Sequence, residues 1–417
     1  MNLQDIIAAK LDGRANSAEE LQFLSRGAAD GSLSDEELTA WLHAAFASTL
    51  SAQETADLTL AMAGSGERLD LTGLPRPWVD KHSTGGVGDK TTIVLLPLLA
   101  ACGLTVVKMS GRGLGITGGT VDKLGSVPGF RLDLTPEEMV SQAGRIGLAI
   151  TGQTPRLAPA DKKLYALRDV SGTVGSVPLI VSSILSKKIA GGAETVVMDV
   201  KCGCGAFMKT LPEAQALAGA LVETAKLCGL DLHLSITDMD QPLGRAVGNA
   251  LEVKEAIRVL QGEEGRFRDL CLHFAGIALA AVGKGAEEDA RRALGSGSAL
   301  AKAREWFGAQ GADLSVFDSE DWCTNSAVAE IRHEGGPGWV RRIDAAAIGQ
   351  AVLDMGGGRK SKEDEIEPTV GFVLHVEVGD EIATGEPLLQ VHGIAPDLSA
   401  SITVSDRRIG NRPVILH

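Results

Sequence analysis

Residues 81–109 read KHSTGGVGDKTTIVLLPLLAACGLTVVKM, and this stretch decides the fold class. A glycine-rich loop comes first, the apolar run over residues 93–104 predicts a helix, and residues 104–109 predict a strand. The same order of a helix followed by a strand is predicted downstream, with a helix over residues 178–190 and a strand over residues 195–200. Strands that alternate with helices indicate crossover connections, so an α/β protein with a mainly parallel sheet is expected.

The segments on either side of this region have other sequence patterns. Capping boxes recur in the first part of the chain and each opens an apolar-periodic run, which predicts a small helical lobe. The boxes pair Ser17 with Glu20, Ser34 with Glu37 and Ser51 with Glu54. From about residue 338, short β-branched runs are broken by Gly, Asp and Pro turns, which predicts a small β-rich (α+β) carboxy-terminal domain.

The composition excludes several classes of function. The chain has 417 residues and a formal net charge of -14, and its aromatic residues are only nine Phe, five Trp and one Tyr. Binders of nucleic acids and anionic membranes gain affinity by neutralising phosphates with Lys and Arg, so neither partner is expected. The amino terminus has neither a signal-peptide core nor an apolar span of membrane length, which predicts a cytoplasmic protein. The six cysteines are too scattered to predict a disulfide framework.

Two glycine-rich loops carry most of the chemical information. Residues 81–92 precede an apolar helix, and residues 108–123 read KMSGRGLGITGGTVDK between a predicted strand and a predicted helix. Glycines let backbone N–H groups approach a ligand, hydroxyls add donors, and a following helix amino terminus adds partial positive charge. Lys81 and Lys108 supply formal charge. Both loops therefore predict sites for a phosphate-sized anion.

Other phosphate-binding motifs fit these loops less well. A Walker A motif would need glycine where Asp89 stands. Gly113 to Gly118 does satisfy G-x-G-x-x-G after a strand, and Asp133 is a candidate ribose partner for a dinucleotide. Three residues separate the strand from the first glycine, however, which weakens the interpretation as a Rossmann dehydrogenase.

A third segment supplies polar side chains suited to a carbonyl-bearing ring. Ser183 and Lys187 are four residues apart and share one face of the predicted helix, which favours a polar pocket for Lys187. The neighbouring Lys188 is expected to be solvated. The planar guanidinium of Arg168 offers a fork of donors to a heterocycle.

The runs SGRGLGITGGTVDKL (residues 110–124), LAPADKKLYALRDV (157–170) and VMDVKCGCGAFMKT (197–210) closely resemble the thymidine and pyrimidine-nucleoside phosphorylases. The resemblance covers nearly the whole chain. It implies a pentosyltransferase of pyrimidine salvage that converts uridine, thymidine or deoxyuridine and phosphate to the free base and (2-deoxy)ribose 1-phosphate. It also implies a homodimer with a helical lobe over residues 1–70, joined in space by a helix near residues 163–193. A central α/β domain over residues 71–335 and a β-rich domain over residues 338–417 would follow.

The resemblance also implies roles for individual residues. Phosphate would be held by Lys81, Ser83, Thr92, Lys108, Ser110 and Thr120. The pyrimidine would be contacted, and its departure catalysed, by His82, Arg168, Ser183 and Lys187. Lys108 could also reach a 2'-hydroxyl, which favours acceptance of both uridine and thymidine.

No organic cofactor is implied, and inorganic phosphate would be the co-substrate. Some family members hold a monovalent cation near the phosphate loop, and the matching positions for potassium here are Gly88, Lys90, Leu243, Ala246 and Glu255. Other members have Thr at the position of Lys90, and an ammonium there could repel or replace the ion.

The chain departs from the family pattern at a few positions. Ile116 stands where His is common, Gly125 and Gly175 stand where acids are common, and Ser171-Gly172 stands where Thr-Ala is common. These departures concern substrate preference and rate more than the type of reaction. They leave open a catalytically weakened homologue that binds nucleosides, and the related phosphoribosyltransferases, which use pyrophosphate and usually magnesium, also remain an alternative.

Overall fold

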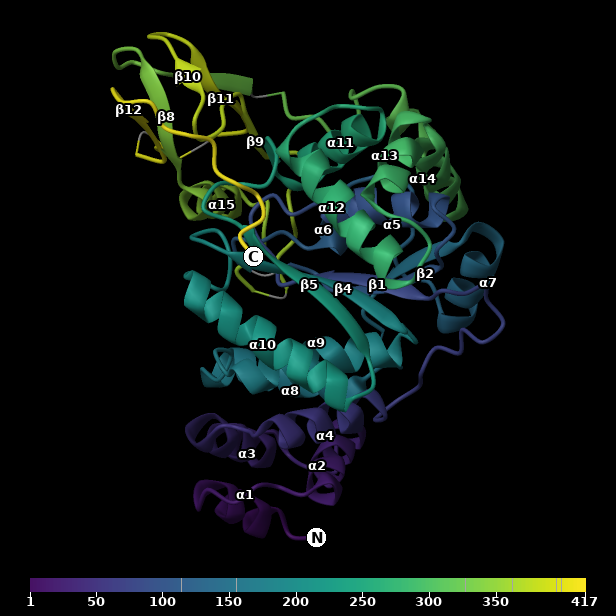
Figure 1. Ribbon diagram of the computed structural model, residues 1–417. Helices are drawn as coiled ribbons and strands as arrows, with labels where there is room; N and C mark the ends of the chain where they lie inside the picture. The colour runs from purple at the N-terminus through teal and green to yellow at the C-terminus, as the bar shows by residue number, and fades with distance from the viewer. Residues whose placement is uncertain (114, 155, 327, 362, 395, 399) are drawn as a thin grey trace.

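The structure is a computed structural model that describes residues 1–113, 115–154, 156–326, 328–361, 363–394, 396–398 and 400–417. A helical lobe lies at the amino-terminal end, a sheet with helices on both faces lies in the middle, and a β-rich part lies at the opposite end (Figure 1). The predicted α/β fold class, with its helical lobe and β-rich end, is confirmed.

The helical lobe starts where the capping boxes predict. The hydroxyls of Ser17, Ser34 and Ser51 each accept a hydrogen bond from the backbone N–H of the glutamate three residues later, whose carboxylate accepts from the serine N–H. Each such cap is worth about 1 kcal/mol. The predicted capping boxes are thus confirmed. The helices of this part are α1 (Leu3–Leu11), α2 (Ala18–Asp30), α3 (Asp35–Ser48) and α4 (Ala52–Ala63).

The segment predicted as a single helix near residues 163–193 is divided into α8 (Pro159–Ser171) and α9 (Val177–Ala190). The single helix is wrong because Gly172 has a φ of 73°, a left-handed conformation that ends α8. Leu164 and Leu167 of α8 pack into the core of the helical lobe beside Trp41. Another face of α9 packs against the sheet.

The sheet of the middle lobe is parallel, with the strand order β3-β2-β1-β4-β5. Its strands are β1 (Val79–Ser83), β2 (Val106–Ser110), β3 (Leu148–Gly152), β4 (Thr195–Cys202) and β5 (Asp231–Asp238). A parallel bridge between Trp78 and Thr105 joins β1 and β2 just before their starts, and it is isolated, so the two strands separate towards their carboxyl ends. The strand order reverses beside β1, and ligands of open α/β sheets bind at the carboxyl edge of such a reversal.

Helices cover both faces of this sheet (Figure 1). On one face lie α9 and α10 (Leu211–Leu227). On the other face, α5 (Thr91–Ala101) is buried along most of its length, as its continuous apolar run requires. The remaining helices of this lobe are α6 (Thr120–Gly125), α7 (Pro136–Ile146), α11 (Asn249–Leu260), α12 (Arg266–Ala281), α13 (Glu287–Gly295), α14 (Ser298–Ala309) and the 3-10 helix Leu314–Phe317.

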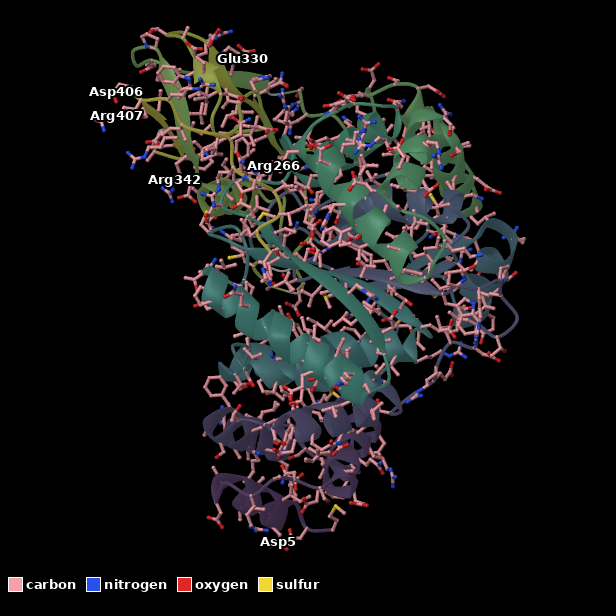
Figure 2. The ribbon with its side chains drawn as sticks, viewed as in Figure 1. Asp5, Arg266, Glu330, Arg342, Asp406 and Arg407 are labelled. Atoms are coloured by element: carbon pink, nitrogen blue, oxygen red, sulfur yellow. The ribbon has the colours of Figure 1, made fainter. Side chains whose placement is uncertain are left out.

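The carboxy-terminal part contains antiparallel sheets with the orders β6-β9-β11-β7 and β10-β8-β12. One strand, β6 (Ala246–Val247), comes from the chain between β5 and α11. The other strands are β7 (Val328–Arg332), β8 (Gly338–Ile343), β9 (Gly371–Leu374), β10 (Glu381–Ile382), β11 (Pro387–His392) and β12 (Ile402–Ser405), and the helix α15 (Ala345–Asp354) follows β8. The end of the chain returns to the middle lobe, where Arg412 and Arg266 both pair with Asp238 at the end of β5; Figure 2 shows Arg266 at this junction. Within the described residues, no helix is long and apolar enough to cross a membrane.

Candidate active site

The first glycine-rich loop begins from a buried ion pair at the end of β1. Lys81 is 1% exposed, and its ammonium donates to the Thr91 hydroxyl and lies 3.9 Å from the Asp89 carboxylate. Burial acts to raise the pKa of Asp89, but the charges of Lys81, Lys201 and Lys123 outweigh it and hold that pKa well below its usual value. Asp89 is therefore ionised, and it fixes the start of α5 by accepting from the Thr91 N–H and hydroxyl.

The backbone of this loop is shaped for an anion. Gly85 and Gly88 have φ values of 89° and 77°, which residues with a Cβ rarely adopt. Ser83 and Gly85 are partly exposed, and the Ser83 hydroxyl accepts from the Gly85 N–H at 3.2 Å. Thr92 lies in the first turn of α5, where backbone N–H groups have no partner within the helix. Asp89 already accepts from the Thr91 N–H and the Lys90 carbonyl from the Ile93 N–H, which leaves the Thr92 N–H at a helix terminus of the kind that binds phosphate.

The second glycine-rich loop follows Ser110 at the end of β2 and closes on itself. A side-chain carbon at Gly119 would lie only 2.2 Å from the backbone nitrogen of Gly113, so neither position has room for one. The Asp122 carboxylate accepts from the Gly113 N–H at 2.6 Å. Thr120 then begins α6. Glycine is therefore required here by the close approach of two backbone segments.

Lys123 ties the two loops together. It is fully buried, its ammonium donates to the Asp89 carbonyl at 2.6 Å, and it lies 2.7 Å from the Glu252 carboxylate of α11. No role for Lys123 was predicted from the sequence. The signal available was a lysine shortly after the glycine-rich run, and the structure places it in a short helix whose residues 121–124 are buried.

A buried cluster of Asp80, Lys108 and Lys188 lies behind the loops. Asp80 lies 2.6 Å from the Lys188 ammonium and 3.4 Å from that of Lys108, which also donates to the Lys81 carbonyl. Burial lowers the pKa of Lys108 to about 7 against the opposing pull of Asp80. The expectation that Lys188 is solvated is wrong, because this lysine is 3% exposed and neutralises a buried carboxylate.

His82 is partly exposed and lies on β1 next to Lys81, where the charges of Lys188 and Lys108 act on it. Burial, followed by the charges of Lys188 and Lys108, holds the pKa of His82 well below its usual value. The imidazole is therefore neutral at pH 7, able to donate one hydrogen bond and accept another. A phosphate bound nearby would offset the lysine charges and raise this pKa.

The face opposite the loops is formed by α8 and α9. The Lys187 ammonium donates to the Ser183 hydroxyl at 2.9 Å and pairs with the Asp161 carboxylate at 2.5 Å, so the expected polar pocket exists. A small hollow between the lobes is lined by Lys187 and Asp161 from this face and by Met109 and Gln153 from the sheet side.

Arg168 lies near the same face and is 2% exposed. Its terminal nitrogens donate to the backbone carbonyls of Leu179 and Val174, each at 2.9 Å. Its Nε is buried and lacks a hydrogen-bond partner among the described residues. An unmet buried donor costs roughly 1–3 kcal/mol, so an acceptor that reached this group would be favoured.

Comparison with known proteins places these residues in a family. Models of a glycosyl transferase family match at residues 4–66 (helical bundle domain) and 75–300 (a/b domain), and residues 339–409 match a pyrimidine nucleoside phosphorylase C-terminal domain. The pyrimidine-nucleoside phosphorylase of Geobacillus stearothermophilus is 46% identical over 94% of this chain and 92% of its own length. That of Staphylococcus haemolyticus is 44% identical over 100% and 99% of the respective chains. The chain belongs to the pyrimidine-nucleoside phosphorylase family.

A solved structure of another activity shares the fold. Anthranilate phosphoribosyltransferase from Thermus thermophilus superposes with a TM-score of 0.59 at 20% identity, covering 73% of this chain and 99% of that chain. The family membership does not favour the dinucleotide interpretation. Asp133, its candidate ribose partner, is an exposed residue that pairs with Arg131.

The family departures lie at the edges of this site. Ile116 packs against Gly349 of α15, where a side-chain carbon would meet the Ile116 carbonyl at 3.0 Å. Gly125 and Gly175 are exposed and have room for a side chain. The carboxy-terminal part also contributes to the second loop, where Arg359 pairs with Asp122, and the sequence pattern did not predict this contact.

The positions predicted to hold potassium surround a side chain. Lys90 donates to the Leu243 carbonyl at 2.6 Å and the Ala246 carbonyl at 2.8 Å, and lies 2.5 Å from the Glu255 carboxylate. The backbone of Gly88 borders the same carbonyls. The predicted ligand positions do come together, but the ammonium stands among them, so these residues do not fit a potassium ion in addition.

Proposed function

We propose that this protein catalyses the reversible phosphorolysis of pyrimidine nucleosides, yielding the free base and ribose 1-phosphate or 2-deoxyribose 1-phosphate. One observation carries the proposal: the two glycine-rich loops that follow β1 and β2 are tied together by Lys123, and a small hollow beside the end of β2 is lined by Met109 on one side and by Asp161 and Lys187 of α8 and α9 on the other. The names of the Geobacillus and Staphylococcus relatives support the same reaction.

The charges that the reaction develops suit these two faces. As the glycosidic bond breaks, positive charge grows on the sugar and negative charge grows on the departing base. Phosphate on the loops stabilises the sugar and attacks C1' with inversion, while donors on α8 and α9 stabilise the base. The lobes hold the two reactants in line and limit the access of water.

We assign phosphate binding to the loop side, where backbone N–H groups and hydroxyls provide most of the donors. The residues are Lys81, Ser83, Thr92, Lys108, Ser110 and Thr120. Lys81 is already engaged by Asp89, so it would act by its field as well as by direct contact.

We assign base binding to Arg168, Ser183, Lys187 and His82. Arg168 and Lys187 would donate hydrogen bonds to the carbonyl oxygens of the ring. The Nε of Arg168, which has no partner among the described residues, supports this role. His82 starts neutral, as its lowered pKa indicates, and donates a hydrogen bond to the leaving base. Lys108 lies near the sugar side of the loops, and its contact with a 2'-hydroxyl would allow uridine as well as thymidine and deoxyuridine.

We also propose a cytoplasmic salvage enzyme that works as a homodimer with no organic cofactor, and with units over residues 1–70, 71–335 and 338–417. Exposed apolar side chains on α1, α3 and α8 support a dimer through the helical lobe: Leu11, Phe46, Tyr165 and Val170. Sedimentation of the native protein, and of a V170D variant, tests the dimer; a monomeric native protein would contradict it.

The reaction is tested by following release of uracil or thymine from uridine, thymidine and deoxyuridine, with and without phosphate. We expect release only with phosphate. A parallel assay offers the free base with a phosphoribosyl pyrophosphate donor and magnesium. Activity in that assay alone would favour a phosphoribosyltransferase, and tight nucleoside binding without any turnover would favour the weakened homologue.

A further inference from the structure

The phosphate loop is closed by a lysine that no solvent reaches. Lys90 directly precedes α5 and is 0% exposed. Its ammonium has three N–H donors, and three oxygens meet it: the carbonyls of Leu243 and Ala246 and the carboxylate of Glu255, at 2.5–2.8 Å. The donors and acceptors thus match in number.

The oxygens around this ammonium form a cation site in their own right. Backbone carbonyls and a carboxylate are the ligands that replace the water of a bound metal cation. The Glu255 carboxylate also accepts from the N–H groups of Arg245 and Ala246, each at 2.7 Å, so it is held in place independently of Lys90. The packing is tight, because a side-chain carbon at Gly244 would lie 2.9 Å from the Lys90 nitrogen.

We propose that the Lys90 ammonium is a built-in monovalent cation that takes the place of a free potassium ion. It joins the loop ahead of α5 to the turn at residues 243–246 and to α11, and so positions the amino terminus of α5 without an ion from solution. Folding of the loop, and phosphorolysis, are then independent of the monovalent cation supplied. The activity part of this statement depends on the proposed function, whereas the folding part does not.

Two variants test this inference. Lys90→Thr removes the ammonium and leaves the oxygens around a space that a potassium ion can enter. Lys90→Met removes the charge but keeps the space filled with an uncharged chain, so it is the matched control. Each protein is compared in potassium chloride and in tetramethylammonium chloride at equal ionic strength, because the larger cation cannot enter the space. The readouts are the thermal midpoint of unfolding and the rate of uridine phosphorolysis.

For the native protein we expect the same midpoint and rate in both salts. For K90T we expect potassium to raise the midpoint by mass action and to raise the rate by about tenfold or more, whereas K90M should respond to neither salt. Potassium-dependent folding of K90T would also support the proposal.

A native protein whose midpoint rises in potassium would overturn the inference, as would a K90T variant that behaves like K90M or is unfolded in both salts. The midpoint does not depend on nucleoside turnover. A wrong assignment of the reaction would therefore remove the rate response alone and leave the potassium response of the midpoint intact.

Discussion

The two sides of the candidate site differ in how their charged groups are paired. The loop side comprises residues 81–92 and 108–123 with the strands behind them, and the helix side comprises α8 and α9. On the loop side, Lys81, Lys90, Lys123 and Lys201 are each less than 2% exposed, and each lies within 4 Å of a carboxylate. On the helix side, Lys187 is partly open to solvent, and Arg168 keeps a buried N–H without a partner among the described residues. Charges that are already neutralised hold the loops in shape, whereas one buried donor on α8 has no hydrogen-bond partner among the described residues. The loop side is thus mainly framework, and the phosphate contacts that we propose there would come mostly from backbone N–H groups and hydroxyls.

The largest effect is expected from breaking the framework at Lys123. Lys123→Met leaves the Glu252 carboxylate buried without its partner, and removing one member of a buried pair costs about 3–5 kcal/mol. Urea unfolding should therefore show a large loss of the free energy of unfolding. Adding Glu252→Gln removes the second charge and should restore much of the loss. A cost of K123M below about 1 kcal/mol would show that this pair is not part of the framework.

The next effect should appear in catalysis beyond any loss of stability, because Arg168 also donates to the Leu179 and Val174 carbonyls. Arg168→Ala removes the guanidinium that we propose contacts the base, and loss of a donor to the reacting group lowers kcat/KM by roughly 100- to 1,000-fold. Arg168→Lys keeps the charge but not the planar fork, and should remain strongly impaired. Tyr165→Phe is the matched control, because its ring lies 5.9 Å from the guanidinium and keeps that contact. Turnover by R168A within about threefold of the native rate would remove Arg168 from the base site.

Local sequence patterns predicted much of this architecture. The capping boxes predicted the starts of α2, α3 and α4, and the apolar runs predicted α5, α9, β2 and β4 within a few residues. These features depend on residues close together in the chain, so local sequence patterns predict them. The break between α8 and α9 was missed in the helix predicted near residues 163–193, because it depends on the left-handed conformation of Gly172, which a glycine permits but does not require.

The buried ion pairs could not be predicted in the same way. Lys188 looks like a solvated lysine in the sequence, and only the approach of Asp80 from β1 explains its burial. Lys123 and Glu252 are far apart in the chain and meet only in the folded protein. The spacing of Ser183 and Lys187 did predict their contact, because both lie on one helix face.

A smaller, pH-dependent effect is expected at Lys108. With a pKa of about 7, Lys108 carries its charge below that pH and loses it above. Lys108→Arg stays charged throughout. The ratio of native to K108R kcat/KM for phosphate should therefore fall by about tenfold between about pH 6 and pH 8. Titration of phosphate itself cancels in the ratio, and a ratio that stays constant over this range would mean that Lys108 does not act on phosphate through its charge.

The smallest effect should separate two glycines in the connection that carries α8 into α9. Gly172 has a φ of 73°, so Gly172→Ala should lower the free energy of unfolding by about 1 kcal/mol. At Gly175 a side-chain carbon would meet no atom within 4 Å and φ is not positive, so Gly175→Ala should change it by less than about 0.5 kcal/mol. Urea midpoints measure both, and a larger loss in G175A would reverse the assignment. This connection also supplies the Val174 carbonyl that accepts a hydrogen bond from Arg168. If the kcat/KM of folded G172A falls as well, the helix side depends on backbone conformation, whereas the loop side depends on paired charges.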